Sequence, residues 1–131
     1  MRPLVVLAIE DEAVRAACAY ALAAAEFDVT TIDAPTAWPG DASRVVVVAD
    51  VSAESESGWR LVAELKRRDA ACGIPIVVLA ADTGPKTRAR ARRERCAAIV
   101  AKTCPPNLLA SGIRAVLARN AARETGSLNL L

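Results

Sequence analysis

The sequence predicts an α/β fold in which helices cover both faces of a doubly wound, five-stranded parallel sheet. Four apolar runs are continuous rather than alternating, which is typical of strands buried on both faces; they span residues 4–9, 45–49, 75–80 and 97–101. Segments with helical spacing lie between these runs, and strands that alternate with helices form parallel sheets with right-handed crossovers. The chain has 131 residues, 53% of them hydrophobic, which suits a single domain with its own core.

The first half of the chain supplies one full helix and the remaining strand. After the first apolar run, an apolar stripe from Val14 to Ala25 predicts a helix, and Asp11 is a suitable N-cap for it. Residues 27–31 alternate in polarity and fit an edge strand. The stretch 34–40 contains two prolines and a glycine, so we expect only a reduced second helix before the next apolar run.

In the second half, a helix is expected after each strand. Apolar residues at helical spacing predict one helix after Gly58 and a last helix whose first turn contains Pro106. We expect the domain to span residues 1–121, and residues 122–131 to form a frayed tail or the start of a linker.

The segment 84–95, between the fourth and fifth strands, is strongly basic. It contains one acid, Glu94, and few apolar side chains, and its cations are Lys86, Arg88, Arg90, Arg92, Arg93 and Arg95. A helix of this composition is weakly anchored by burial and should have low local stability. Its charge fits either a solvated face or a docking surface for an acidic partner. We do not expect it to bind nucleic acid, because no helix-turn-helix pattern or interleaved aromatic residues accompany it.

Composition excludes several classes of site. The chain has no histidine, which excludes histidine-based catalysis and histidine-ligated metals. Cys18, Cys72, Cys96 and Cys104 form no C-x-x-C pair, so we expect free thiols in a reducing cytoplasm. The net charge of +2 is too small to indicate nucleic acid by itself. No apolar run approaches the length of a membrane span, so we expect a cytoplasmic protein without a membrane segment.

Charged residues follow three of the apolar runs. Glu10 and Asp11 follow the first run, Asp50 follows the second, which is the third strand of the predicted sheet, and Lys102 follows the last. Each of them alone is most simply a cap, a turn residue or a solvated side chain. In a sheet of order 2-1-3-4-5, however, the first and third strands flank the point where strand order reverses, and ligands bind there at the carboxyl ends. Three carboxylates favour Mg²⁺, and a lysine can pair with a phosphoryl oxygen, a set suited to forming an aspartyl phosphate.

In these residues and their spacing, the chain resembles the receiver domain of bacterial two-component response regulators, over residues 3 to about 120. Gly58 follows Asp50 by eight positions (58 − 50), and Lys102 follows Ala80 by 22 (102 − 80), as in that family. The resemblance implies a flavodoxin-like fold with strand order 2-1-3-4-5. It also implies a phosphoacceptor switch rather than an enzyme.

The resemblance implies a role for each residue at the strand ends. Asp50 would accept a phosphoryl group from a sensor histidine kinase, and Lys102 would bind the phosphate. Mg²⁺ would be held by Glu10, Asp11 and Asp50, with help from the backbone carbonyl of Ser52.

The resemblance also implies contacts beyond these residues. Ala80 and Ala81 would border the bound phosphoryl group at the end of the fourth strand. A downstream partner would bind the face formed by helix 84–95 and the last strand and helix, and a homodimer is also compatible with the resemblance.

Four positions depart from the family. Ala80 stands where Thr or Ser usually supplies a hydroxyl, which removes one hydrogen bond to the phosphoryl group, typically worth about 1.5–3 kcal/mol. Ile99 replaces the usual aromatic switch residue, while Thr103 and Glu54 replace prolines. An alternative function is therefore a receiver-like interaction module that acts independently of phosphorylation.

Overall fold

The computed structural model describes residues 2–32, 44–52, 56–67 and 73–129. Its strands are β1 (Leu4–Ala8), β2 (Asp28–Thr31), β3 (Val45–Val51), β4 (Ile76–Ala80) and β5 (Ala98–Ala101). Its helices are α1 (Glu12–Ala24), α2 (Ser57–Arg67), α3 (Pro85–Arg93) and α4 (Pro106–Asn129). The strands form one parallel sheet in the order β2-β1-β3-β4-β5, which confirms the predicted fold class and strand order.

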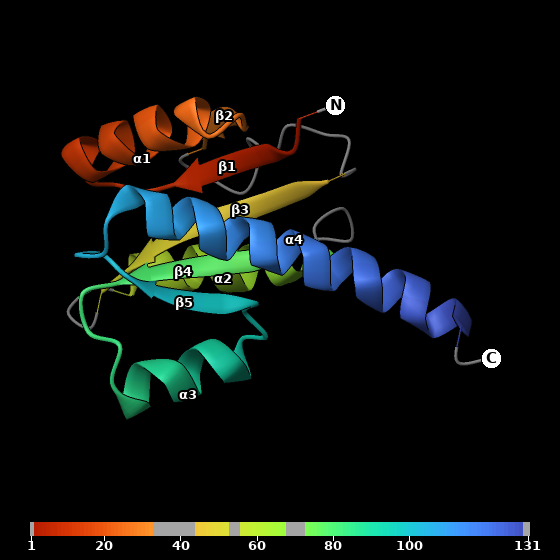
Figure 1. The fold of residues 1–131 in the computed structure, drawn as a ribbon. Coiled ribbons are helices and arrows are strands. Elements are labelled where there is room, and N and C mark those ends of the chain that lie inside the picture. Colours follow the sequence, from red (N-terminus) through yellow and green to blue (C-terminus); the bar gives the residue numbers. More distant parts are fainter. Residues whose placement is uncertain (1, 33–43, 53–55, 68–72, 130–131) are drawn as a thin grey trace.

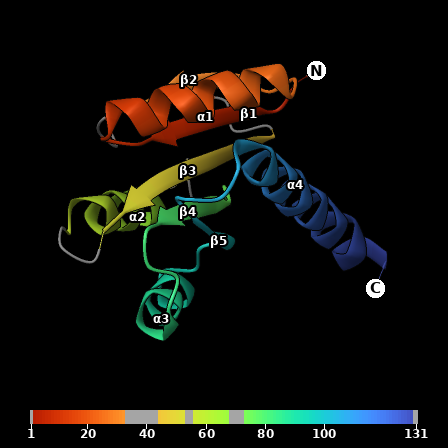
Figure 2. The same cartoon turned by 60° about the vertical axis from the view of Figure 1, so that its left-hand side comes forward.

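The helices cover both faces of the sheet (Figures 1 and 2). Helices α1 and α4 contact each other on one face, where Leu22 and Ile113 are fully buried. Helix α2 covers the other face with Val62 and Leu65, and α3 adds Ala91 to the same core cluster. Successive residues of β3 and β4 point alternately into the two clusters, so both faces of these strands are dry and their apolar runs are continuous.

Local sequence determines how the first and second of these helices begin. The Asp11 carboxylate accepts hydrogen bonds from the backbone N–H groups of Ala13 (2.9 Å) and Val14 (3.1 Å), which confirms the predicted N-cap of α1. Helix α2 begins at Ser57, so Gly58 lies inside its first turn rather than before it. A Cβ atom on Gly58 would lie 2.1 Å from the carbonyl oxygen of Asp50, so only glycine allows α2 to approach β3 this closely.

Two further expectations concern the regions outside the sheet. Helix α4 continues to Asn129, so it extends into the segment 122–131 that we expected to be a frayed tail or the start of a linker. The division into a domain at 1–121 and a tail stays a prediction. The reduced second helix predicted at 34–40 lies outside the described residues. Within the described part of the chain, no helix is both long enough and apolar enough to cross a membrane.

Candidate functional site

Asp50 and Lys102 form an ion pair at the carboxyl edge of the sheet. Asp50 is the penultimate residue of β3, and Lys102 comes directly after β5. The Lys102 Nζ atom lies 2.5 Å from Asp50 Oδ1, and the two side chains are only 24% and 11% exposed. Because β4 lies between β3 and β5, the lysine has to reach past the end of β4, and its own backbone N–H donates to the carbonyl of Ala80 at 3.0 Å. The fold therefore joins two charges that are far apart in the sequence.

Asp50 Oδ1, the buried oxygen of this ion pair, is partnered by the Lys102 ammonium. Asp50 Oδ1 is inaccessible to solvent and accepts no directed hydrogen bond among the described residues, so the Lys102 ammonium is what balances its charge. A partly buried carboxylate is costly without such a partner. Asp50 is therefore held as a paired anion in a confined position.

The acids that follow β1 lie at the same edge of the sheet. Ala8 pairs with Ala49 in the β1–β3 register, so Glu10 and Asp11 come just beyond the level of Asp50. Both side chains are exposed, and that of Asp11 is bonded to the start of α1. Among the residues that the structure describes, no three Cys, Asp or Glu side chains lie close enough together to hold a metal ion. The edge thus brings the predicted carboxylates near one another in backbone register, while their side chains are not gathered into a metal-binding group.

The remaining predicted positions lie around the ends of β3 and β4. Ala80 is 3% exposed, and it lines a small hollow of about 30 Å³ together with Ser52, Ala81 and Thr87. This hollow is on the α2 side of the sheet, because Ala80 belongs to the core cluster on that face. Ile99 packs partly buried against the same cluster. No hydroxyl therefore projects from the end of β4 itself.

Two thiols near the ion pair were not predicted as neighbours of the site. Cys18 of α1 and Cys104, three residues after β5, line a hollow of about 240 Å³, and Lys102 lines the same hollow. Burial raises the pKa of the Cys18 thiol, and the charges of Cys104 and Asp50 raise it further. The helical spacing of Cys18 with the buried residues of α1 was the available signal for its position. Cys18, Cys96 and Cys104 are free thiols, as predicted, and Cys72 lies outside the described residues.

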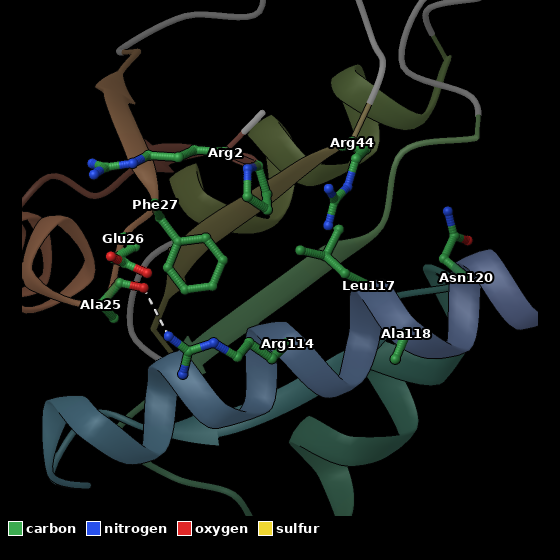
Figure 3. A pocket seen from close by; sticks show the side chains of 10 residues that line it. Arg2, Ala25, Glu26, Phe27, Arg44, Arg114, Leu117, Ala118 and Asn120 are labelled. Carbon is green, nitrogen blue, oxygen red and sulfur yellow. Dashed lines mark hydrogen bonds between the residues drawn. The ribbon is translucent and has the colours of Figure 1, made fainter.

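A larger hollow, of about 790 Å³, lies at the opposite edge of the sheet (Figure 3). Pro3 and Arg44, which precede β1 and β3, line it together with residues of α4. Arg114 of α4 donates to the carbonyl of Ala25 at 2.7 Å and its guanidinium lies 5.2 Å from the centre of the Phe27 ring. Arg114 thus ties α4 to the carboxyl end of α1. This hollow is remote from Asp50, so we do not assign the site to it.

Comparison with known proteins identifies the fold. No protein-family model matches the chain, and no curated protein matches its sequence. Among solved structures, the chemotaxis protein CheY4 of Vibrio cholerae aligns with a TM-score of 0.76 at 17% identity, covering 88% of this chain and 99% of CheY4. A putative response regulator from Chloroflexus aurantiacus gives a TM-score of 0.75 at 17% identity, covering 90% and 99% of the two chains. A response regulator protein from Burkholderia multivorans gives 0.64 at 24% identity, covering 88% and 95%. The chain therefore has the fold of response regulator receiver domains.

Proposed function

We propose that this protein is a phosphoacceptor signalling domain in which Asp50 receives a phosphoryl group from a sensor histidine kinase. The observation that supports this proposal most directly is the ion pair between Asp50 and Lys102 at the carboxyl edge of the sheet. Ligands of doubly wound folds bind at this edge. The receiver fold of the chain and the position of Asp50 near the end of β3 agree with the proposal.

In the proposed reaction, a carboxylate oxygen of Asp50 attacks phosphorus as the phosphorus–nitrogen bond of the kinase phosphohistidine breaks. The product is an acyl phosphate on Asp50 and a neutral histidine on the kinase. Lys102 is already beside the carboxylate, so it can pair with an oxygen of the incoming phosphoryl group after releasing Oδ1. The chain itself acts as a switch rather than as an enzyme with an external substrate.

Mg²⁺ is the metal that this donor set suits, because its side-chain ligands would be carboxylate oxygens. Glu10, Asp11, Asp50 and the backbone carbonyl of Ser52 would hold it, and when bound it would reduce repulsion between the carboxylates and the phosphoryl group. The described side chains do not yet form a three-ligand group, so binding would need new rotamers of the acids that follow β1. Asp11 would then exchange a cap contact for a metal contact.

The proposed output is binding of a downstream protein in the cytoplasm, through α3 and the adjoining face of β5 and α4. Helix α3 is suited to this role because it is basic and buries only Ala91. A second function, as an interaction module that acts without phosphate, is favoured by one observation. Ala80 and Ile99 offer neither a hydroxyl nor an aromatic ring with which to sense the phosphoryl group.

The test is the intact mass of the protein after incubation with Mg²⁺ and acetyl phosphate. We expect a gain of one phosphate that is lost in Asp50→Asn and retained in Asp28→Asn, a matched change of an exposed aspartate in β2. Lys102→Ala should lower the yield while leaving the acceptor in place. Absence of any gain in the wild type, together with absence of Mg²⁺ binding by calorimetry, would refute the proposal and leave the interaction module.

A further inference from the structure

Arg90 of α3 is held in a two-point clamp with Glu56, the residue just before α2. Arg90 Nη1 donates to Glu56 Oε1 at 2.8 Å, and Arg90 Nη2 lies 2.8 Å from Glu56 Oε2. This is the fork-to-fork geometry in which a guanidinium binds a carboxylate most strongly. The hydrogen bond to Arg90 is the main cause that lowers the pKa of Glu56, so the pair is fully charged at neutral pH.

The Arg90 guanidinium is also oriented by an aromatic ring, that of Trp59. Arg90 Cζ lies 5.1 Å from the centre of the Trp59 ring, within the range of a cation–π contact. Trp59 is 5% exposed and belongs to the core cluster of α2, so the ring is a fixed platform. Arg88, two positions earlier on the same helix, donates to the backbone carbonyl of Thr83. Arg90 is therefore presented in a set orientation rather than as a freely moving surface cation.

The neighbouring cations of α3 have no such partner. Within the part of the chain that the structure describes, Glu56 is the one carboxylate that forms an ion pair with a cation of α3. Arg92 and Arg93 are exposed on the same helix. The side chains of Arg90 and Glu56 are themselves 34% and 56% exposed, so a carboxylate from outside the molecule can reach this position.

We infer that Glu56 occupies a carboxylate-binding position on α3 as an internal competitor, and that an acidic peptide segment of a partner protein binds by replacing it at Arg90. The inference rests on the proposed role of α3 as a partner-binding face, and it specifies the chemistry of the partner and the contact that restrains binding. The two side chains are partly exposed to water, which limits even a two-point ion pair, so a partner that brings several carboxylates to Arg90 and the adjacent cations can displace the single carboxylate of Glu56.

The test measures binding of a fluorescein-labelled hexaglutamate peptide by fluorescence polarisation at low salt, without phosphate or metal. Glu56→Gln should tighten binding by about two- to fivefold, the factor that an exposed ion pair typically contributes. The matched control is Glu64→Gln, which removes the same charge from a different ion pair, the one between Glu64 and Arg67 within α2. The control should change binding less than Glu56→Gln does.

Arg90 is tested against a cation of the same helix. Arg90→Ala should weaken binding of the peptide more than Arg92→Ala, and Glu56→Gln should give no gain in the Arg90→Ala background. Thermal unfolding of each variant, followed by circular dichroism, establishes that it is folded. A single-stranded oligonucleotide of equal charge is the second probe, and it should not show the same preference for Arg90.

Several results would overturn the inference. Equal effects of Glu56→Gln and Glu64→Gln would show that binding follows net charge alone. No binding of the peptide by the wild type and by Glu56→Gln would show that α3 does not take carboxylates. An oligonucleotide that binds as tightly and responds in the same way to both Arg90→Ala and Glu56→Gln would refute selectivity for carboxylates. Because the assay uses no phosphoryl donor, its failure is separate from failure of Asp50 to accept phosphate.

Discussion

Gly58 determines how closely α2 approaches the backbone of the proposed acceptor, and Gly58→Ala should destabilise the protein. The added Cβ would lie 2.1 Å from the Asp50 carbonyl oxygen, 3.0 Å from Val51 Cα and 3.1 Å from the Asp50 carbonyl carbon. All three atoms belong to the backbone of β3, so no side chain can turn aside. A Cβ atom needs at least 3.0 Å from a neighbouring atom, so the Cβ and the Asp50 oxygen must move apart by at least 0.9 Å (3.0 − 2.1). This movement of the helix from the strand loosens the packing of Trp59 and Val62.

The expected change in the free energy of unfolding follows from two opposing effects. Overpacking against a rigid neighbour costs about 1–3 kcal/mol, with the upper part of the range fitting a clash with backbone. Alanine recovers up to about 1 kcal/mol through its higher helix propensity. We therefore expect a net loss of about 2 kcal/mol, measured as a lower midpoint of urea unfolding with an unchanged slope.

Two other glycines provide controls for Gly58→Ala. A Cβ on Gly73 would meet nothing within 4 Å, and one on Gly112 of α4 would lie 4.0 Å from Val100 Cγ2, an ordinary contact. Gly73→Ala should be neutral or slightly stabilising, and Gly112→Ala should stabilise the protein by about 0.5–1 kcal/mol. If Gly58→Ala were as stable as the wild type or as Gly112→Ala, the reasoning from close approach to β3 would be refuted.

Three further predictions concern ionisable groups. Asp11→Ala should cost about 1 kcal/mol of stability through loss of the N-cap, while Asp11→Asn keeps the cap and lowers Mg²⁺ affinity in calorimetry; equal stability of Asp11→Ala and the wild type would contradict the cap. The hydrogen bond from Arg90 lowers the pKa of Glu56 from its ordinary value, so the clamp should stabilise the docking of α3 at neutral pH and lose this effect as the pH falls through that lowered pKa. The protection factors of the α3 amides, calculated against the intrinsic exchange rate at each pH, should therefore fall in acid in the wild type, and an equal fall in Glu56→Gln would count against it. Burial raises the pKa of Cys96 to about 11, so iodoacetamide should alkylate it more slowly at pH 8 than it alkylates free glutathione, which a rate above that of glutathione would disprove.

The sheet could be predicted from the sequence because strands that are buried on both faces have continuous apolar runs. The run from Val45 to Ala49 is apolar throughout, and these residues are at most 3% exposed. The charged residues at strand ends were also predictable, because parallel strands place their carboxyl ends at one edge whatever the details of packing. The pairing of Asp50 with Lys102 follows from that arrangement.

The side-chain details could not be predicted in the same way. An aspartate after a strand suits a metal site and a helix cap equally well, and only the structure shows that the Asp11 carboxylate is bonded to α1. The clamp between Glu56 and Arg90 joins exposed side chains 34 positions apart, and it depends on how α2 and α3 are rotated about their axes. The continuation of α4 to Asn129 runs through Gly126 and Ser127, whose weak helix propensity favoured an earlier end.

The sheet separates the proposed acceptor, Asp50, from the proposed partner-binding helix, α3. Asp50 shares its side of β3 with Val46 and Val48, toward α1 and α4, whereas Trp59 and the clamped Arg90 belong to the opposite side. The layer between them has no buried polar or charged residue among those described, so it offers no hydrogen-bonded route through its thickness. A change at Asp50 therefore has to be passed on by apolar packing or by the backbone near the end of β3, where the Asp50 carbonyl lies against Gly58 of α2.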